Sequence, residues 1–278
     1  MLIGSQERVF GYDGAPTIHT VSSIAKLLWD RGDSHNAEIL FSRALDSLVR
    51  TEGELHDLSL TAMHSLGGML YEIERVRDAE VLLRRNWEGR RKTLGIMNEK
   101  TLTAAFSLAK ALNVTAEWKH EPDFPQKLLE CEELLRITVD NRLNMLGTVH
   151  SDTTDAIVFL ADFFMEHNRH QESLVEYKRV YEIYTSLHGP EDVQTGRVSY
   201  GIGACLQYTR LYSEAIPYFE QAHKAYTKAW GSDTAHSSTA NRHRLAIVDA
   251  LQMFTYTKKR AKQSEYEKRV IPKMYQNR

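Results

Sequence analysis

Six glycines divide the chain at nearly regular intervals, and this spacing constrains the fold more than any other feature. They are Gly11, Gly53, Gly95, Gly147, Gly189 and Gly231, separated by 42, 42, 52, 42 and 42 residues. A period of this length is typical of stacked two-helix units, which bury their apolar faces only against a neighbouring unit. The spacing therefore predicts an all-α solenoid.

Each glycine predicts the end of one helix and the approach of the next. Glycine accepts the left-handed backbone conformation that ends many helices. Six residues later every unit has a hydroxyl side chain, which we expect to cap the following helix. These hydroxyl residues are Thr17, Ser59, Thr101, Thr153, Thr195 and Ser237.

Apolar residues spaced three and four apart predict two amphipathic helices in each unit. The first helix of the first unit shows this spacing at Val21, Ile24, Ala25 and Leu28. The second helix of each unit is predicted to open near a polar residue followed by a small one. These pairs are Asn36-Ala37, Asp78-Ala79, Glu130-Cys131, Glu172-Ser173 and Glu214-Ala215.

Two short blocks connect this pattern to a known family. One runs Leu146-Gly147-Thr148-Val149-His150-Ser151-Asp152-Thr153, and the other runs Arg210-Leu211-Tyr212-Ser213-Glu214-Ala215. The repeat resembles the kinesin-light-chain-like type of tetratricopeptide repeat, which has 42 residues. The resemblance implies a right-handed superhelix of about five helix-turn-helix units with a C-terminal capping helix. It also implies that a protein or peptide binds in the concave groove, without a cofactor.

The expected organisation is one array with a short segment at each end. Residues 1–10 read as a remnant or cap helix, either cut from a longer protein or reduced to a cap. The array covers 11–257, with units starting near the six glycines. Residues 258–278 carry eight basic and two acidic residues and form a basic helix or tail. Such a segment caps the array or meets an acidic partner or membrane surface.

The third unit is ten residues longer than the others, and the extra residues fall in an insertion at 113–126. Pro122 and Pro125 are expected to interrupt the helix there. Trp118 and Phe124 give the insertion apolar side chains to pack with. It is either a tolerated surface loop or a lid over one edge of the groove.

The resemblance implies that the first helices line the groove. The candidate ligand-binding residues there are Ser107, Lys110, Asp155, Phe159, Asp162, Arg197, Tyr200, Tyr208 and His243. Family members that grip a peptide backbone do so with asparagines of an N-N-L-A block. The second of those positions holds no asparagine here, but Ser23, Ser65, Ser107, Phe159, Gly201 and His243.

Several readings of the groove remain open. The first is a scaffold or adaptor that binds a protein or peptide. The alternative is a pocket for a small polar molecule at the groove centre, in which Asp155, Asp162 and His243 would be the acid–base groups of a biosynthetic tailoring enzyme. The same charges also fit a network of ion pairs between units, or a purely structural spacer.

Composition excludes several classes of function. The net charge is −2 with 26% charged residues, so nothing points to nucleic acid. The chain has no long apolar run for membrane insertion, and a cytoplasmic location is expected. Cys131 and Cys205 are predicted to be inert core thiols. His167 and His170 are predicted to lie in a solvated turn, so no metal site is expected. A homodimer is left open.

Overall fold

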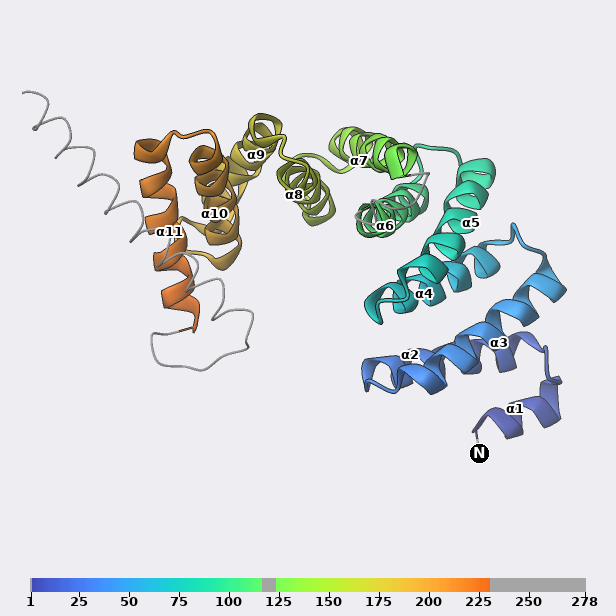
Figure 1. Ribbon diagram of the computed structural model, residues 1–278. Coiled ribbons are helices and arrows are strands. Elements are labelled where there is room, and N and C mark those ends of the chain that lie inside the picture. The colour runs from blue at the N-terminus through green and yellow to red at the C-terminus, as the bar shows by residue number, and fades with distance from the viewer. Residues whose placement is uncertain (1, 117–123, 231–278) are drawn as a thin grey trace, which may run out of the picture. The chain divides into compact units, whose positions relative to one another are not determined.

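The protein was analysed as a computed structural model, which describes residues 2–116 and 124–230. These residues form two compact units, divided between Gly147 and Thr148, and each unit is treated by itself (Figure 1). We call them the N-terminal and C-terminal units. The predictions for Trp118, Gly231, Ser237, His243, the capping helix and the basic segment 258–278 lie outside the described residues.

The described part of the chain is built of helices without strands. The N-terminal unit contains α1 (Leu2–Phe10), α2 (Ala15–Asp30), α3 (Ser34–Glu52), α4 (Asp57–Glu72), α5 (Val76–Leu94), α6 (Glu99–Thr115) and α7 (Phe124–Leu146). The C-terminal unit contains α8 (Ser151–Glu166), α9 (His170–His188), α10 (Val193–Tyr208) and α11 (Tyr212–Trp230). From α2 onward they form five antiparallel pairs, which we number as repeats one to five. The predicted α-solenoid is confirmed.

The glycine turns confirm the predicted helix ends. Gly11, Gly53, Gly95, Gly147 and Gly189 all have φ between 78° and 93°. A side chain would be strained there, so glycine permits a tight turn between the second helix of one repeat and the first helix of the next.

The predicted caps are wrong by three residues. The residues that cap α4, α6, α8 and α10 are His56, Asn98, His150 and Asp192, whose side chains accept a backbone N–H. The five hydroxyl residues that the structure describes lie within the first turn and are fully buried; they are Thr17, Ser59, Thr101, Thr153 and Thr195. In repeats one and two the hydroxyl donates to the turn glycine's carbonyl oxygen, from Thr17 to Gly11 at 2.9 Å and from Ser59 to Gly53 at 2.7 Å. These two hydroxyls therefore stabilise the glycine turn by hydrogen bonds from the first turn of the following helix.

Small residues bring the paired helices into close contact. Ala25 of α2 and Ala37 of α3 are fully buried. On α4, a Cβ at Gly67 would lie 2.9 Å from Cγ of Leu83 on α5. A larger side chain at these positions would separate the paired helices.

Part of the insertion extends the flanking helices. By the 42-residue period α6 would end at residue 114 and α7 would begin at 128, yet α6 ends at Thr115 and α7 begins at Phe124. Pro125 lies in the first turn of α7, where its missing N–H is harmless, so it stands at the start of a new helix. Pro122 lies outside the described residues.

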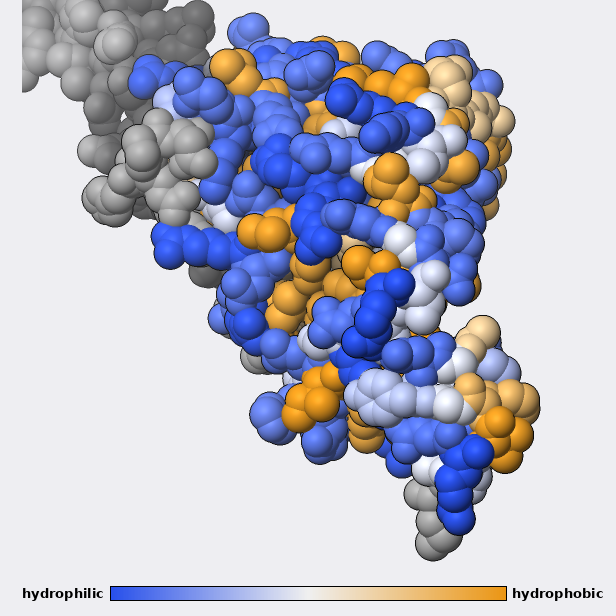
Figure 2. Space-filling model, turned by 90° about the vertical axis from the view of Figure 1, so that its right-hand side faces the viewer, coloured by the Kyte–Doolittle hydropathy of each residue, from blue (hydrophilic) through white to orange (hydrophobic). Residues whose placement is uncertain are grey.

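The surface carries scattered apolar side chains. On the face seen from the side of α1, α3 and α5, hydrophobic residues form separate groups among hydrophilic ones (Figure 2). Within residues 2–116 and 124–230, no helix is long and apolar enough to cross a membrane.

Candidate binding site

The predicted groove residues belong to two units rather than to one described surface. Ser107 and Lys110 lie on α6 in the N-terminal unit. Asp155, Phe159 and Asp162 lie on α8, and Arg197, Tyr200 and Tyr208 lie on α10, all in the C-terminal unit. The structure therefore describes them as two separate groups.

The α6 group is modest. The Nζ of Lys110 lies 5.2 Å from the ring centroid of Tyr71, at the end of α4, a distance at which the ammonium is attracted to the ring. Ser107 is half-buried on the same helix. Phe124, the predicted lid residue that the structure describes, is half-buried at the start of α7.

Asp162 is the centre of the α8–α10 group. Arg197 Nη2 donates to Asp162 Oδ2 at 2.8 Å, and the hydroxyl of Tyr177, on α9, donates to Oδ1. Burial raises the pKa of the Asp162 carboxyl above its ordinary value, while the two donors act in the opposite direction. Burial and the adjacent carboxylate also raise the pKa of the Tyr177 hydroxyl. The predicted acid–base residue thus has both oxygens in internal bonds.

Gly201 explains how Tyr177 reaches this carboxylate. A Cβ at Gly201 would lie 2.6 to 2.8 Å from three carbons of the Tyr177 ring. The ring therefore lies directly against the backbone of α10, at one of the positions where the family's peptide-gripping asparagine is missing. The space beside that position is filled by the protein itself.

The other residues of this group differ in exposure and in their ring contacts. Asp155 is exposed and Phe159 half-buried. Tyr200 packs edge-on against Phe219 of α11, with ring centroids 5.5 Å apart. Tyr208, 64% exposed, stacks on His170 at 4.4 Å. No group of three His, Cys, Asp or Glu side chains within the described residues could hold a metal ion.

Two buried arginines were missed in the sequence. Arg90 on α5 and Arg142 on α7 occupy equivalent positions in repeats two and three and are 5% and 3% exposed. The Arg90 guanidinium donates to Asn86 (2.9 Å), Asp57 (3.1 Å) and Thr61 (3.0 Å). Arg142 donates to Thr103, the equivalent of Thr61, at 3.4 Å. Aligning the repeats residue by residue would have revealed both, since their neighbours share the apolar pattern of a core position.

Arg90 also influences a histidine, which leads to a prediction about pH. Burial, and then the Arg90 charge, lower the pKa of His64 on α4. The folded protein therefore favours neutral His64. This contribution to stability is complete above the unfolded pKa of about 6.5 and is lost as the pH falls from there through the lower folded pKa.

We expect the free energy of unfolding to fall between pH 7.5 and 5.5, and to fall less in His64→Gln. Urea denaturation at both pH values measures this. His35→Gln, at an exposed site on α3, corrects for the loss of one histidine. An identical pH dependence in the two variants would show that His64 makes no such contribution.

A cavity lies in the N-terminal unit, between the first helices of repeats one and two. Its volume is about 240 Å³. Ile18, Phe41, Leu48 and Ala62 form its buried floor. The rim carries polar side chains from α2, α3, α4 and the turn before α2. These are Asp13, His19, Ser22, Thr51, Glu52, Thr61 and Ser65. We call it the α2–α4 pocket.

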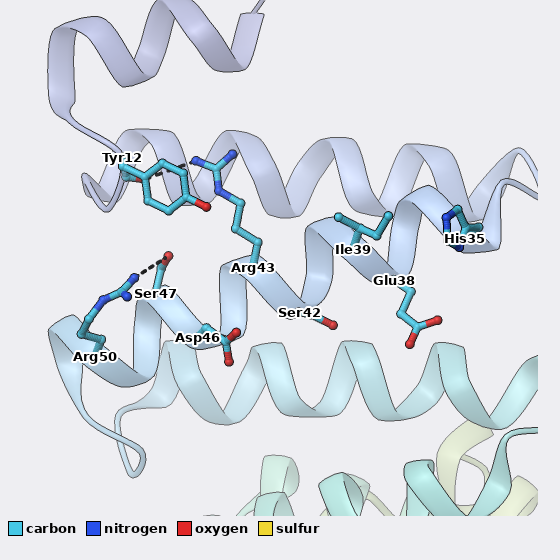
Figure 3. A pocket seen from close by; sticks show the side chains of 9 residues that line it. All are labelled: Tyr12, His35, Glu38, Ile39, Ser42, Arg43, Asp46, Ser47 and Arg50. Carbon is cyan, nitrogen blue, oxygen red and sulfur yellow. Dashed lines mark hydrogen bonds between the residues drawn. The ribbon is translucent and has the colours of Figure 1, made fainter.

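A second, shallower hollow lies on the exposed side of α3 (Figure 3). Arg43 reaches from α3 toward α1, where it pairs with Glu7 at 2.6 Å and lies 3.9 Å above the Tyr12 ring. The other residues that line it are His35, Glu38, Ile39, Ser42, Asp46, Ser47 and Arg50. Glu38, Arg43, Ser47 and Arg50 are bonded to other residues of the protein, so the α2–α4 pocket is the better candidate for a ligand.

The two cysteines offer no reactive site. Cys131 and Cys205 are free thiols without exposed surface. Burial raises the pKa of Cys205 to about 11, so the thiolate is scarce at neutral pH. We expect Ellman's reagent to modify the native protein only at the rate of unfolding, and two thiols once it is denatured. Rapid modification of one thiol in the native protein would contradict this placement.

Two comparisons by sequence bear on the repeats. One tetratricopeptide-repeat profile matches residues 59–99 and another matches residues 152–228. Both matches fall on the helix pairs described above. These two segments of the chain are tetratricopeptide repeats. A search of curated proteins by sequence found no match.

Solved structures share the fold of these tetratricopeptide repeats. A Podosopora anserina protein of nearly identical TPR-like repeats, described as a kinesin light chain, has a TM-score of 0.66 at 19% identity over 77% of this chain and 97% of its own. BtubC (BKLC) from P. vanneervenii has a TM-score of 0.67 at 15% identity, over 84% of this chain and 91% of its own. The MamA protein has a TM-score of 0.54 at 17% identity, over 79% of this chain and 97% of its own. At these identities the similarity establishes the fold alone.

Proposed function

We propose that this tetratricopeptide-repeat chain is a scaffold or adaptor that binds a protein or peptide on the first helices of its N-terminal unit. Such repeats generally mediate protein–protein interactions. The α2–α4 pocket is the observation that carries the proposal. An apolar floor with a polar rim suits one side chain of a partner and the polar backbone on either side of it.

The paired state of Asp162 favours binding over catalysis. A general acid or base must exchange its proton with a substrate, yet both oxygens of this carboxylate are held by Tyr177 and Arg197. A cytoplasmic setting, as expected from the sequence, is part of the proposal.

Filling the pocket is the test. Ser65 on its rim is half-buried, and Phe159 occupies the equivalent position in repeat four, so the fold accepts phenylalanine there. We expect Ser65→Phe to remove most of the partner protein that the wild type captures from native extract. Ser107→Phe is the matched control, since Ser107 is equivalent and half-buried but lies outside the pocket.

Quantitative mass spectrometry of the captured proteins distinguishes the outcomes. Proteins retained by the wild type and by Ser107→Phe, but lost from Ser65→Phe, would support the proposal. Equal retention by all three would place the binding surface elsewhere. Circular dichroism confirms that each variant remains folded.

A further inference from the structure

The α2–α4 pocket occurs where later repeats have a long side chain. The position lies in the second helix, 37 residues after the repeat's glycine when the ten-residue insertion is discounted. From repeat one to repeat five it is Leu48, Arg90, Arg142, Tyr184 and Tyr226, and all five are buried. Leucine is the shortest of these side chains, so repeat one has the least to fill the space.

The neighbours of Arg90 show where that space lies. Arg90 is bonded to Asp57 and Thr61, Asp57 is also paired with Lys100 at 2.7 Å, and the Arg90 charge acts on His64. One repeat earlier the equivalents of these four residues are Ala15, His19, Ser22 and Leu58, and every one of them lines the α2–α4 pocket. The pocket is therefore the slot that Arg90 fills in repeat two, left empty in repeat one.

The charges around the empty slot are acidic. The residues lining it include two carboxylates, Asp13 and Glu52, and no lysine or arginine. Asp13 accepts hydrogen bonds from Ser47 at 2.7 Å and Arg50 at 2.8 Å. Glu52 is exposed, and its carboxylate has no hydrogen bond or ion pair with the described residues. Glu52 therefore provides a carboxylate at the rim of the slot. The carboxylate that pairs with Arg90 in repeat two, Asp57, has no counterpart in repeat one, where the equivalent residue is Ala15.

We propose that the pocket receives an arginine side chain from the partner. An arginine has a long apolar stem and a planar cationic end, which match the apolar walls at Phe41, Leu48 and Leu58 and the carboxylate of Glu52. The inference rests on the proposed function and names the chemistry of its ligand. Arg90 and Arg142 show that the repeat accommodates this side chain from within.

The test uses the full chain and small probes of defined chemistry. Nα-acetyl-arginine amide is titrated into protein carrying ¹³C-labelled Ile and Leu methyl groups, and the shifts of Ile18, Leu48 and Leu58 are followed by NMR. The controls are the amides of acetyl-citrulline, which is isosteric but neutral, and acetyl-norleucine, which is apolar. We expect saturable shifts with arginine and a Kd at least tenfold lower than with either control.

Two variants make the result specific. Leu48→Tyr places the residue of repeat four in the slot and is expected to abolish the shifts. Glu52→Gln, at an exposed site, is expected to weaken the binding of acetyl-arginine amide about fivefold and to leave the binding of acetyl-norleucine amide unchanged.

Equal binding of norleucine and arginine would overturn the cationic ligand while leaving the proposed function intact, because the pocket would still bind a side chain. Absence of shifts with all three probes would overturn the inference itself. The proposed function fails separately, when Ser65→Phe retains every captured protein.

Discussion

Replacing Asp57 with alanine is expected to lower the free energy of unfolding by about 2–3 kcal/mol. Asp57 pairs with the guanidinium of Arg90, whose side chain is only 6% exposed. Removing the carboxylate would leave a buried cation with neutral partners, Asn86 and Thr61. A buried charge without its counter-charge is costly because water cannot replace the lost partner.

The control for this prediction is another aspartate to alanine change. Asp78 also lies in the first turn of a helix, α5, and pairs with Arg75 at 2.6 Å, but both side chains are about half exposed. Asp78→Ala should cost less than about 1 kcal/mol. Both are measured by urea denaturation followed by circular dichroism.

The double variant Asp57→Ala/Arg90→Met supplies the decisive comparison. It removes the unpaired cation and retains a long side chain in the slot, so stability should recover relative to Asp57→Ala. If Asp57→Ala lowered the free energy of unfolding no more than Asp78→Ala does, the ion pair of Asp57 and Arg90 would not stabilise repeat two.

Gly201→Ala is expected to destabilise the protein by about 1–3 kcal/mol, because its Cβ would overlap the ring of Tyr177. Tyr177 is 5% exposed and bonded to Asp162, so the ring cannot move aside without breaking that bond. The measurement is again the free energy of unfolding in urea.

Gly68 on α4 provides a matched control of opposite sign. It also lies inside a first helix, but nothing lies within 4 Å of a Cβ built there. Gly68→Ala should therefore stabilise by about 0.5–1 kcal/mol through helix propensity. In a Tyr177→Ala background Gly201→Ala should lose most of its cost. A stabilising Gly201→Ala in the native background would contradict the close packing of Tyr177.

The helix order could be predicted from the sequence because it depends on short-range chemistry. A glycine with positive φ and a stripe of apolar residues act within one helix or turn, so Gly53 or Val21 is informative alone. The helix starts were predicted less well. Ser59 resembles a cap by residue type, but capping depends on the neighbouring His56, and the buried hydroxyl bonds backward to Gly53.

The candidate site could not be predicted from the sequence alone, because it depends on contacts between helices and on differences between equivalent positions of the repeats. The prediction grouped Lys110 with Asp162 and Arg197; Lys110 lies in the N-terminal unit and the other two in the C-terminal unit, so this grouping stays a prediction. It missed the α2–α4 pocket because this pocket arises where one repeat has a shorter side chain than the next at the same position. Leu48 leaves unfilled the space that Arg90 fills in repeat two. The role of Gly201 was hidden for the same reason, since it depends on a ring from another helix.

One measurement tests the central claim, that the first helices of the N-terminal unit bind a macromolecular partner. The melting temperature of tagged protein is measured by immunodetection in dialysed native extract, separated into macromolecules and small molecules. A ligand that binds only the folded state raises this temperature. The account predicts that macromolecules protect the wild type and not Ser65→Phe. Protection by small molecules alone, or equal protection of both proteins by macromolecules, would contradict it.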